Sequence, residues 1–173
     1  MFISFDTLPP NARLWIYQAD RSLNPTEEKS LAIILQEFCG QWEAHGQPLK
    51  TSFKIEHHRF VILAVDENYS NASGCSIDGS VRIFKSLRQE SLLAGQAGGI
   101  NFLDRSNVAF LLDDGVKTFP LTELKNLFLS GRLTAATPTF NNLVERKSDF
   151  EKAWLTTVDQ SWLAKYLPKP TAV

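Results

Sequence analysis

The chain contains little cysteine and almost no net charge. Its two cysteines, Cys39 and Cys75, form no Cys-x-x-Cys pair, so the sequence has neither a disulfide framework nor a recognisable zinc-ligand spacing. The formal net charge of −1 gives no overall basic field, which argues against binding to nucleic acid or to acidic membranes. From these two scarcities we expect no cofactor, no metal and a reducing, cytoplasmic location.

Long apolar runs and common catalytic motifs are also missing. The longest clean apolar run covers residues 60–65, whereas a membrane-spanning helix needs about 20 residues. Residues 1–6 lack the basic segment and the long apolar stretch of a signal peptide. The sequence contains no Gly-x-x-x-x-Gly-Lys-Ser/Thr loop, no His-Glu-x-x-His and no Gly-x-Ser-x-Gly. We therefore expect no membrane association and no P-loop ATP hydrolysis, and the oligomeric state stays open.

Apolar residues make up 43% of the chain and follow clear periodic patterns. In chain order, these patterns predict a strand over 13–18, a helix from 25 to about 42–45, strands over 49–56 and 59–65, a helix from about 78, a flexible connection over 95–99, a hairpin over 108–119, a short helix over 121–130 and a last helix from 148.

Residue types at the helix ends support these boundaries. Asn24-Pro25-Thr26-Glu27 is a capping-box sequence, with Asn24 as the N-cap and Glu27 at the third helical position. Gly46 is the expected stop of this first helix. Residues 148–151 form a second capping-box sequence, with Ser148 as the N-cap of the last helix. The residues expected on the inner side of that helix are Trp154, Val158 and Trp162.

The order of these elements predicts an α+β fold with a split-βαβ, or ferredoxin-like, core. We expect the strands over 13–18 and 59–65 to be parallel neighbours at the centre of the sheet, with both helices on one face. An extra hairpin strand and a helical C-terminal extension follow this core. The chain is expected to be a single domain over 1–173, made of an irregular arm over 1–11, the α+β core over 12–112 and the extension over 113–173.

The loop expected over residues 73–78 is the best candidate for a functional site. It contains a thiol, two hydroxyls and a glycine, and it precedes the start of a helix, where unpaired N–H groups favour anions and thiolates. With parallel strands, the chain after 13–18 would lie at the same end as this loop, and Arg21 would supply a positive charge. The predicted ligand-binding residues are Asp20, Arg21, Asp66, Ser73, Gly74, Ser76 and Asp78, and the predicted catalytic residue is Cys75.

Several of these residues also have a purely structural interpretation, which we favour for Cys75. The three histidines, His45, His57 and His58, are expected in solvated turns at the opposite end of the sheet, so no base is expected near this thiol. Cys75 would then pack as a small apolar residue in a tight loop. Asp78 is most simply the N-cap of the following helix.

For the basic and aromatic side chains of the helices, too, a structural role is the better interpretation than a functional one. Arg82, Lys85 and Arg88 share one side of the second helix, and the near-neutral chain makes a solvated helix face the better interpretation than a phosphate site. Trp42, like the other tryptophans, has the spacing of an ordinary core residue.

The most distinctive stretches of the sequence are 13–21, Trp42 with His45-Gly46, 73–78, Asp104-Arg105 and Phe140-Asn141-Asn142-Leu143. On these stretches the chain resembles a family of uncharacterised bacterial proteins that are sometimes labelled "ABC transporter ATPase". The label does not fit the residues, because they contain no nucleotide-binding motif. The resemblance implies one intact domain and transfers no catalytic residues.

Three functions are open on the sequence alone. The leading hypothesis is a non-catalytic binding or interaction module that holds a small anionic ligand, or an acidic group of a partner protein, near Arg21 and residues 73–78. The alternative is an enzyme with Cys75 as nucleophile, assisted by Asp66 or Glu67. The third hypothesis is a module that acts only through protein–protein contacts.

Overall fold

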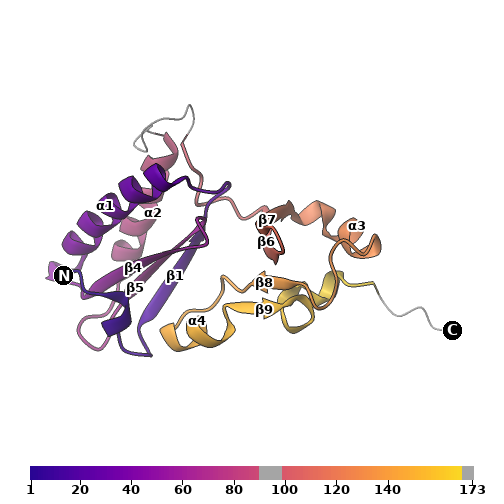
Figure 1. The fold of residues 1–173 in the computed structure, drawn as a ribbon. Helices are drawn as coiled ribbons and strands as arrows, with labels where there is room; N and C mark the ends of the chain where they lie inside the picture. The colour runs from indigo at the N-terminus through magenta and orange to yellow at the C-terminus, as the bar shows by residue number, and fades with distance from the viewer. Residues whose placement is uncertain (90–98, 169–173) are drawn as a thin grey trace. The chain divides into compact units, whose positions relative to one another are not determined.

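The chain combines helices with antiparallel sheets, in agreement with the predicted α+β class. The computed structural model describes residues 1–89 and 99–168 (Figure 1), so residues 95–98 of the expected flexible connection lie outside the described part. The chain falls into two compact units. Unit 1 comprises Met1–Asp104 and Leu143–Glu151, and unit 2 comprises Arg105–Asn142 and Lys152–Val173. That the chain forms a single domain stays a prediction. The division after Asp104 differs from the boundary expected after residue 112, between the core and the C-terminal extension.

Unit 1 contains a three-stranded sheet in the order β1-β5-β4. Its strands are β1 (Arg13–Gln18), β4 (Thr51–Glu56) and β5 (Phe60–Val65), all within the ranges predicted from the sequence. All six residues of β5 are buried, as an unbroken apolar run predicts for a central strand.

The predicted direction of the central strand pair is wrong. β1 and β5 are antiparallel, with Arg13 opposite Val65 and Gln18 opposite Phe60. β4 is also antiparallel to β5, and the strand over 107–112 belongs to the sheet of unit 2, so the expected split-βαβ arrangement with parallel central strands is not observed. An apolar run predicts that a strand is covered on both faces, but the same run fits either direction.

Two long helices, α1 (Pro25–Gln41) and α2 (Gly74–Gln89), lie on one side of this sheet (Figure 1). The capping box of α1 is confirmed, because the Asn24 side chain accepts hydrogen bonds from Thr26 N and Glu27 N, and the Glu27 carboxylate accepts one from Asn24 N. None of the described helices is both long and apolar enough to cross a membrane. Helices and sheet share one core, which includes Leu31, Leu35, Val61, Leu63, Val65, Phe84 and Leu87.

Two helix boundaries differ from the prediction. α1 ends at Gln41, and Gly46 lies instead in a hairpin between β2 (Glu43–Ala44) and β3 (Gln47–Pro48). α2 begins at Gly74, so the expected loop forms its first turn and Asp78 is not its N-cap. Glycine and serine are weak helix formers, yet the first turn tolerates them because its N–H groups have no intrahelical partner to lose.

A buried lysine ties the N-terminal segment to α4 (Lys147–Ala153). Lys147 Nζ donates to two backbone carbonyls beside the short 3₁₀ turn η1 (Phe5–Thr7), that of Leu8 at 2.8 Å. Because Lys147 is the first residue of α4, Ser148 is not an N-cap and the second predicted capping box is wrong. The segment predicted to be an irregular arm is therefore anchored and contains a turn.

Unit 2 contains a four-stranded sheet in the order β7-β6-β8-β9. Its strands are β6 (Asn107–Leu112), β7 (Gly115–Pro120), β8 (Pro138–Phe140) and β9 (Leu155–Thr157). Its helical segments are η2 (Leu121–Glu123), α3 (Leu124–Leu129), η3 (Val158–Gln160) and η4 (Trp162–Tyr166). The predicted hairpin is confirmed by the antiparallel pairing of β6 with β7.

The last predicted helix is interrupted. α4 ends at Ala153 and a strand follows, so the three apolar residues expected on one helix lie on different segments. Trp154 and Val158 are buried, whereas Trp162 is 40% exposed. The helix-like spacing of these three residues thus comes from a bend before β9 and two 3₁₀ turns after it.

Candidate functional site

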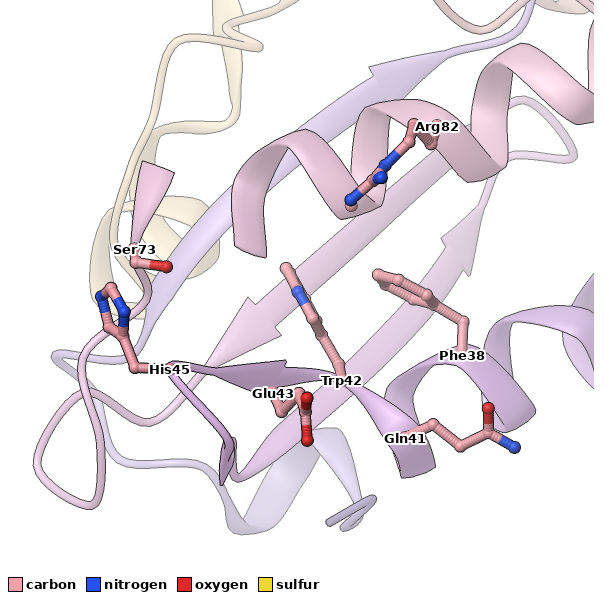
Figure 2. A pocket seen from close by; sticks show the side chains of 8 residues that line it. Phe38, Gln41, Trp42, Glu43, His45, Ser73 and Arg82 are labelled. Atoms are coloured by element: carbon pink, nitrogen blue, oxygen red, sulfur yellow. The ribbon is translucent and has the colours of Figure 1, made fainter. Parts of the chain in front are cut away.

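A pocket of about 400 Å³ lies in unit 1 between the C-terminal end of α1, the β2–β3 hairpin and α2 (Figure 2). Small-molecule sites have volumes of about 300–1,000 Å³. The strand directions bring these segments together: α1 leads back to the start of β4, and β5, antiparallel to β4, ends there too, so α2 begins at the same end. The residues that line the pocket are Phe38, Gln41, Trp42, Glu43, His45, Ser73, Gly79 and Arg82.

Two aromatic rings form an apolar wall of the pocket. Phe38 and Trp42 are one helical turn apart, and their ring centroids lie 4.8 Å from each other. Trp42 also packs against Trp15 of β1, with 5.8 Å between the centroids, and is only 4% exposed. Because neighbouring rings already hold Trp42 in place, a ligand that contacts it has little side-chain entropy to remove.

The β2–β3 hairpin brings His45 to the pocket. His45 and Gly46 have φ values of 52° and 73°, and positive φ at both central residues is the mark of a type I′ turn. This conformation is uncommon for a residue with a side chain, although histidine is among the residues that tolerate it. Figure 2 shows the His45 imidazole next to Ser73, at the edge of the pocket. The tight hairpin thus places an imidazole beside a hydroxyl.

α2 gives its side of the pocket a positive charge. Gly79 and Arg82 are three residues apart and therefore lie on the same side of the helix. Arg82 is exposed and forms no ion pair with any residue that the structure describes. The first turn of α2, beginning at Gly74, adds the partial positive charge of a helix N-terminus. An anionic group is therefore favoured on this side.

The opposite side of the pocket carries Glu43 of β2, which is exposed. Its carboxylate repels an anion, so an anionic ligand would place its charged group at the α2 side, near Arg82. Within the described residues, no cluster of three histidine, cysteine, aspartate or glutamate side chains is placed to hold a metal ion. The arrangement is suited to orienting an organic anion against an aromatic wall.

Gly79 is the lining residue that is least favoured by its own secondary structure. It lies inside α2, where glycine costs about 1 kcal/mol relative to alanine. The sequence-based predictions omit Gly79, and they place Trp42 in the core and Arg82 on a solvated face. A glycine inside an otherwise helical pattern is the sequence signal that marks this position for attention.

Arg21, the charged residue of the predicted site, is engaged by a buried carboxylate. Its Nη1 and Nη2 donate to the two carboxylate oxygens of Glu27 at 2.9 and 2.8 Å, and the Glu27 side chain is 0% exposed. These hydrogen bonds raise the pKa of Arg21 and lower the pKa of Glu27. Arg21 therefore supports the start of α1 and does not line the pocket.

The antiparallel sheet separates the two predicted aspartates. Asp20 follows β1 and accepts a hydrogen bond from Asn101 N at 3.2 Å. Asp66 follows β5 at the other end of the sheet, where it accepts one from Asn68 N at 3.1 Å and pairs with Lys50 at 3.4 Å. The prediction that Asp20 and Asp66 lie at the same end of the sheet is therefore wrong, because β1 is antiparallel to β5.

The predicted loop contributes Ser73 to the pocket, directly before α2. Gly74 is the first residue of α2, and Asp78 is exposed on that helix; neither lines the pocket. Cys75 and Ser76 belong to the first turn of α2, and their side chains lie outside the described part of the structure.

The predicted position of the histidines is wrong for His45. It was expected far from residue 73, but the end of α1 and the start of α2 lie together, so His45 and Ser73 line one pocket. His57 and His58 lie in the turn between β4 and β5, at the other end of the sheet, as expected. There, His58 Nδ1 lies 2.8 Å from a carboxylate oxygen of Glu28.

In comparisons with known proteins, no family model, no curated protein and no solved structure matches this chain. Its function therefore has to be inferred from the geometry and charge of the pocket.

Proposed function

We propose that this protein is a binding module for a small organic ligand with a negatively charged group, held in the pocket of unit 1. The observation that carries this proposal is the state of Arg82, which lines the pocket, is exposed and has no ion-pair partner among the described residues. A guanidinium offers a planar fork of N–H donors that fits a carboxylate or a phosphate. A ligand of that kind would satisfy the fork.

The aromatic wall supports a ligand with an apolar body. Phe38 offers ring surface beside the charged group of Arg82, Trp42 adds the small part that is exposed, and removal of apolar area from water contributes about 25 cal/mol per Å². Charge fixes the orientation of such a ligand, and apolar contact adds to the affinity. A free inorganic anion would leave the aromatic side of this pocket unused.

This proposal keeps the function class predicted from the sequence and moves its centre. The predicted anion partner, Arg21, is held by Glu27 at 2.8 Å. Ser73 stays part of the site, and Arg82, predicted from the sequence to be a solvated residue, takes the place of Arg21.

Titration with phenylacetate tests the proposal, with the indole signal of Trp42 and the backbone signal of Gly79 followed by NMR. We expect both signals to shift, and we expect Arg82→Ala to weaken phenylacetate binding about tenfold, the size of one charge-assisted hydrogen bond. The neutral analogue phenylacetamide should bind the wild-type protein about as weakly as phenylacetate binds the variant.

Lys85→Ala is the matched control, because Lys85 is exposed on α2, carries the same charge and does not line the pocket. It should leave the affinity for phenylacetate unchanged. An equal loss in Lys85→Ala and Arg82→Ala would reduce the effect to general charge and overturn the proposal. Unchanged Trp42 and Gly79 signals with phenylacetate and with phenyl phosphate would overturn it as well.

The position of His45 favours a second candidate, an enzyme that uses Cys75. Cys75 lies in the first turn of α2, two residues after Ser73 in sequence, and Figure 2 shows His45 beside Ser73. A helix N-terminus stabilises thiolates in general, and an imidazole is the usual activating base. A nucleophilic Cys75 predicts fast reaction with iodoacetamide that is slowed in His45→Ala. A rate that is slow and insensitive to His45→Ala would argue against the enzyme.

A further inference from the structure

The local structure around Gly79 indicates the shape of the ligand. This inference rests on the proposed function and extends it. Gly79 lies inside α2 and lines the pocket. A Cβ atom at this position would meet no heavy atom within 4 Å. Its φ is not among the positive values, which in the described glycines occur at Gly46, Gly115 and Gly131. Neither packing nor backbone conformation therefore requires glycine here.

Two other glycines show what the alternatives look like. At Gly99 a Cβ atom would clash with the carbonyl oxygen of Arg88, so the fold itself requires glycine there. Gly40 is exposed on α1, and a Cβ atom there would also meet nothing within 4 Å, but Gly40 does not line the pocket. Gly79 alone of these three combines open space with a place in the pocket wall.

We infer that Gly79 is the specificity-determining position of this pocket and that the ligand is an aromatic carboxylate. The missing side chain lets a flat ring lie directly on the α2 backbone, while the half-buried ring of Phe38 and the small exposed part of Trp42, whose ring points toward α2 in Figure 2, provide apolar contact. Arg82, three residues further along the same side of α2, receives the carboxylate. Glycine is the residue that allows a ligand to approach a backbone this closely.

The test fills the space at Gly79 and measures folding and binding separately. In Gly79→Leu, the melting temperature should stay equal or rise, because leucine favours a helix more than glycine does. The affinity for indole-3-acetate, measured by calorimetry, should fall at least about tenfold because the side chain occupies the place of the ring. Gly79→Ala should lose less affinity than Gly79→Leu.

Gly40→Leu is the matched control, since it makes the same substitution in an exposed helix position with equal open space. It should match the melting temperature change and keep the wild-type affinity for indole-3-acetate. Equal affinity in wild type and Gly79→Leu would overturn the inference and leave the anion pocket standing. An equal loss in Gly40→Leu would also overturn it, by showing an effect of helix stability. Failure of the wild-type protein to bind both indole-3-acetate and phenylacetate would overturn the inference together with the proposed function.

Discussion

Two regions of unit 1 use arginine in opposite ways. Arg21, in the segment after β1, forms two hydrogen bonds with the buried carboxylate of Glu27. Arg59, directly before β5, is only 6% exposed. Arg59 donates to the carbonyl oxygen of Ala19 at 3.3 Å and to Ser22 Oγ at 3.0 Å, and burial lowers its pKa. In the pocket, Arg82 is exposed and forms no ion pair with a described residue.

The difference separates charge that supports the fold from charge that is open to a ligand. A carboxylate removed from water is costly unless it is paired and hydrogen-bonded, so Glu27 depends on Arg21 and on the backbone N–H of Asn24. Arg82, by contrast, pairs with no buried carboxylate among the described residues. A near-neutral net charge therefore does not reveal that the pocket holds an arginine without an ion pair on one side and Glu43 on the other.

The largest effects are expected from breaking the ion pair between Arg21 and Glu27. Glu27→Gln keeps a side chain that can cap α1 but breaks a pair whose carboxylate is 0% exposed. A broken buried pair costs about 3–5 kcal/mol, and because the Arg21 side chain is 38% exposed we expect a smaller loss of about 2 kcal/mol in urea unfolding. Glu37→Gln, an exposed change on the same helix, is the control. Binding of phenylacetate should be unaffected in both variants.

The stability difference between wild type and Glu27→Gln should depend on pH. The pKa of Glu27 is lowered in the folded protein, chiefly by its hydrogen bond from Arg21, so the unfolded state binds the proton more readily. The contribution of the carboxylate is therefore fully present above its ordinary pKa of 4.5 and is lost as the pH falls through the lower folded value. Urea unfolding at a series of acidic pH values checks this. A difference that grows below pH 4.5 would contradict it.

Local elements of the fold could be predicted because their signals lie in neighbouring residues. The strand over 13–18, the capping box at Asn24 and the hairpin of β6 with β7 each follow from a short pattern of residue types. The direction of β1 relative to β5 could not be predicted in this way, because pairing joins residues far apart in sequence. Alternating and apolar patterns are the same when read from either end.

The wrong direction of β1 relative to β5 also determined where the candidate site was predicted. With β1 and β5 parallel, Arg21 would have joined residue 73; with β1 and β5 antiparallel, the end of α1 meets the start of α2 and brings His45 there instead. The signal for a site was partly present, since Ser73 lines the pocket. Arg82 is exposed on α2, as a solvated helix face predicts, and overall charge gives no signal that this basic residue lines a pocket.

The smallest effect on stability is expected for a substitution in the pocket. It tests most directly whether Arg21 and Arg82 have different roles. Arg82→Ala should change the free energy of unfolding by no more than about 0.5 kcal/mol, because an exposed residue without an ion pair contributes little to the folded state. Arg21→Ala should cost about 2 kcal/mol or more, since it leaves the Glu27 carboxylate buried without its cation. Urea unfolding gives both values, and phenylacetate titration gives the reverse ranking for binding. Two arginines with equal effects on stability would show that Arg82 has a role in the fold, and the separation between structural and ligand-binding charge would then fail.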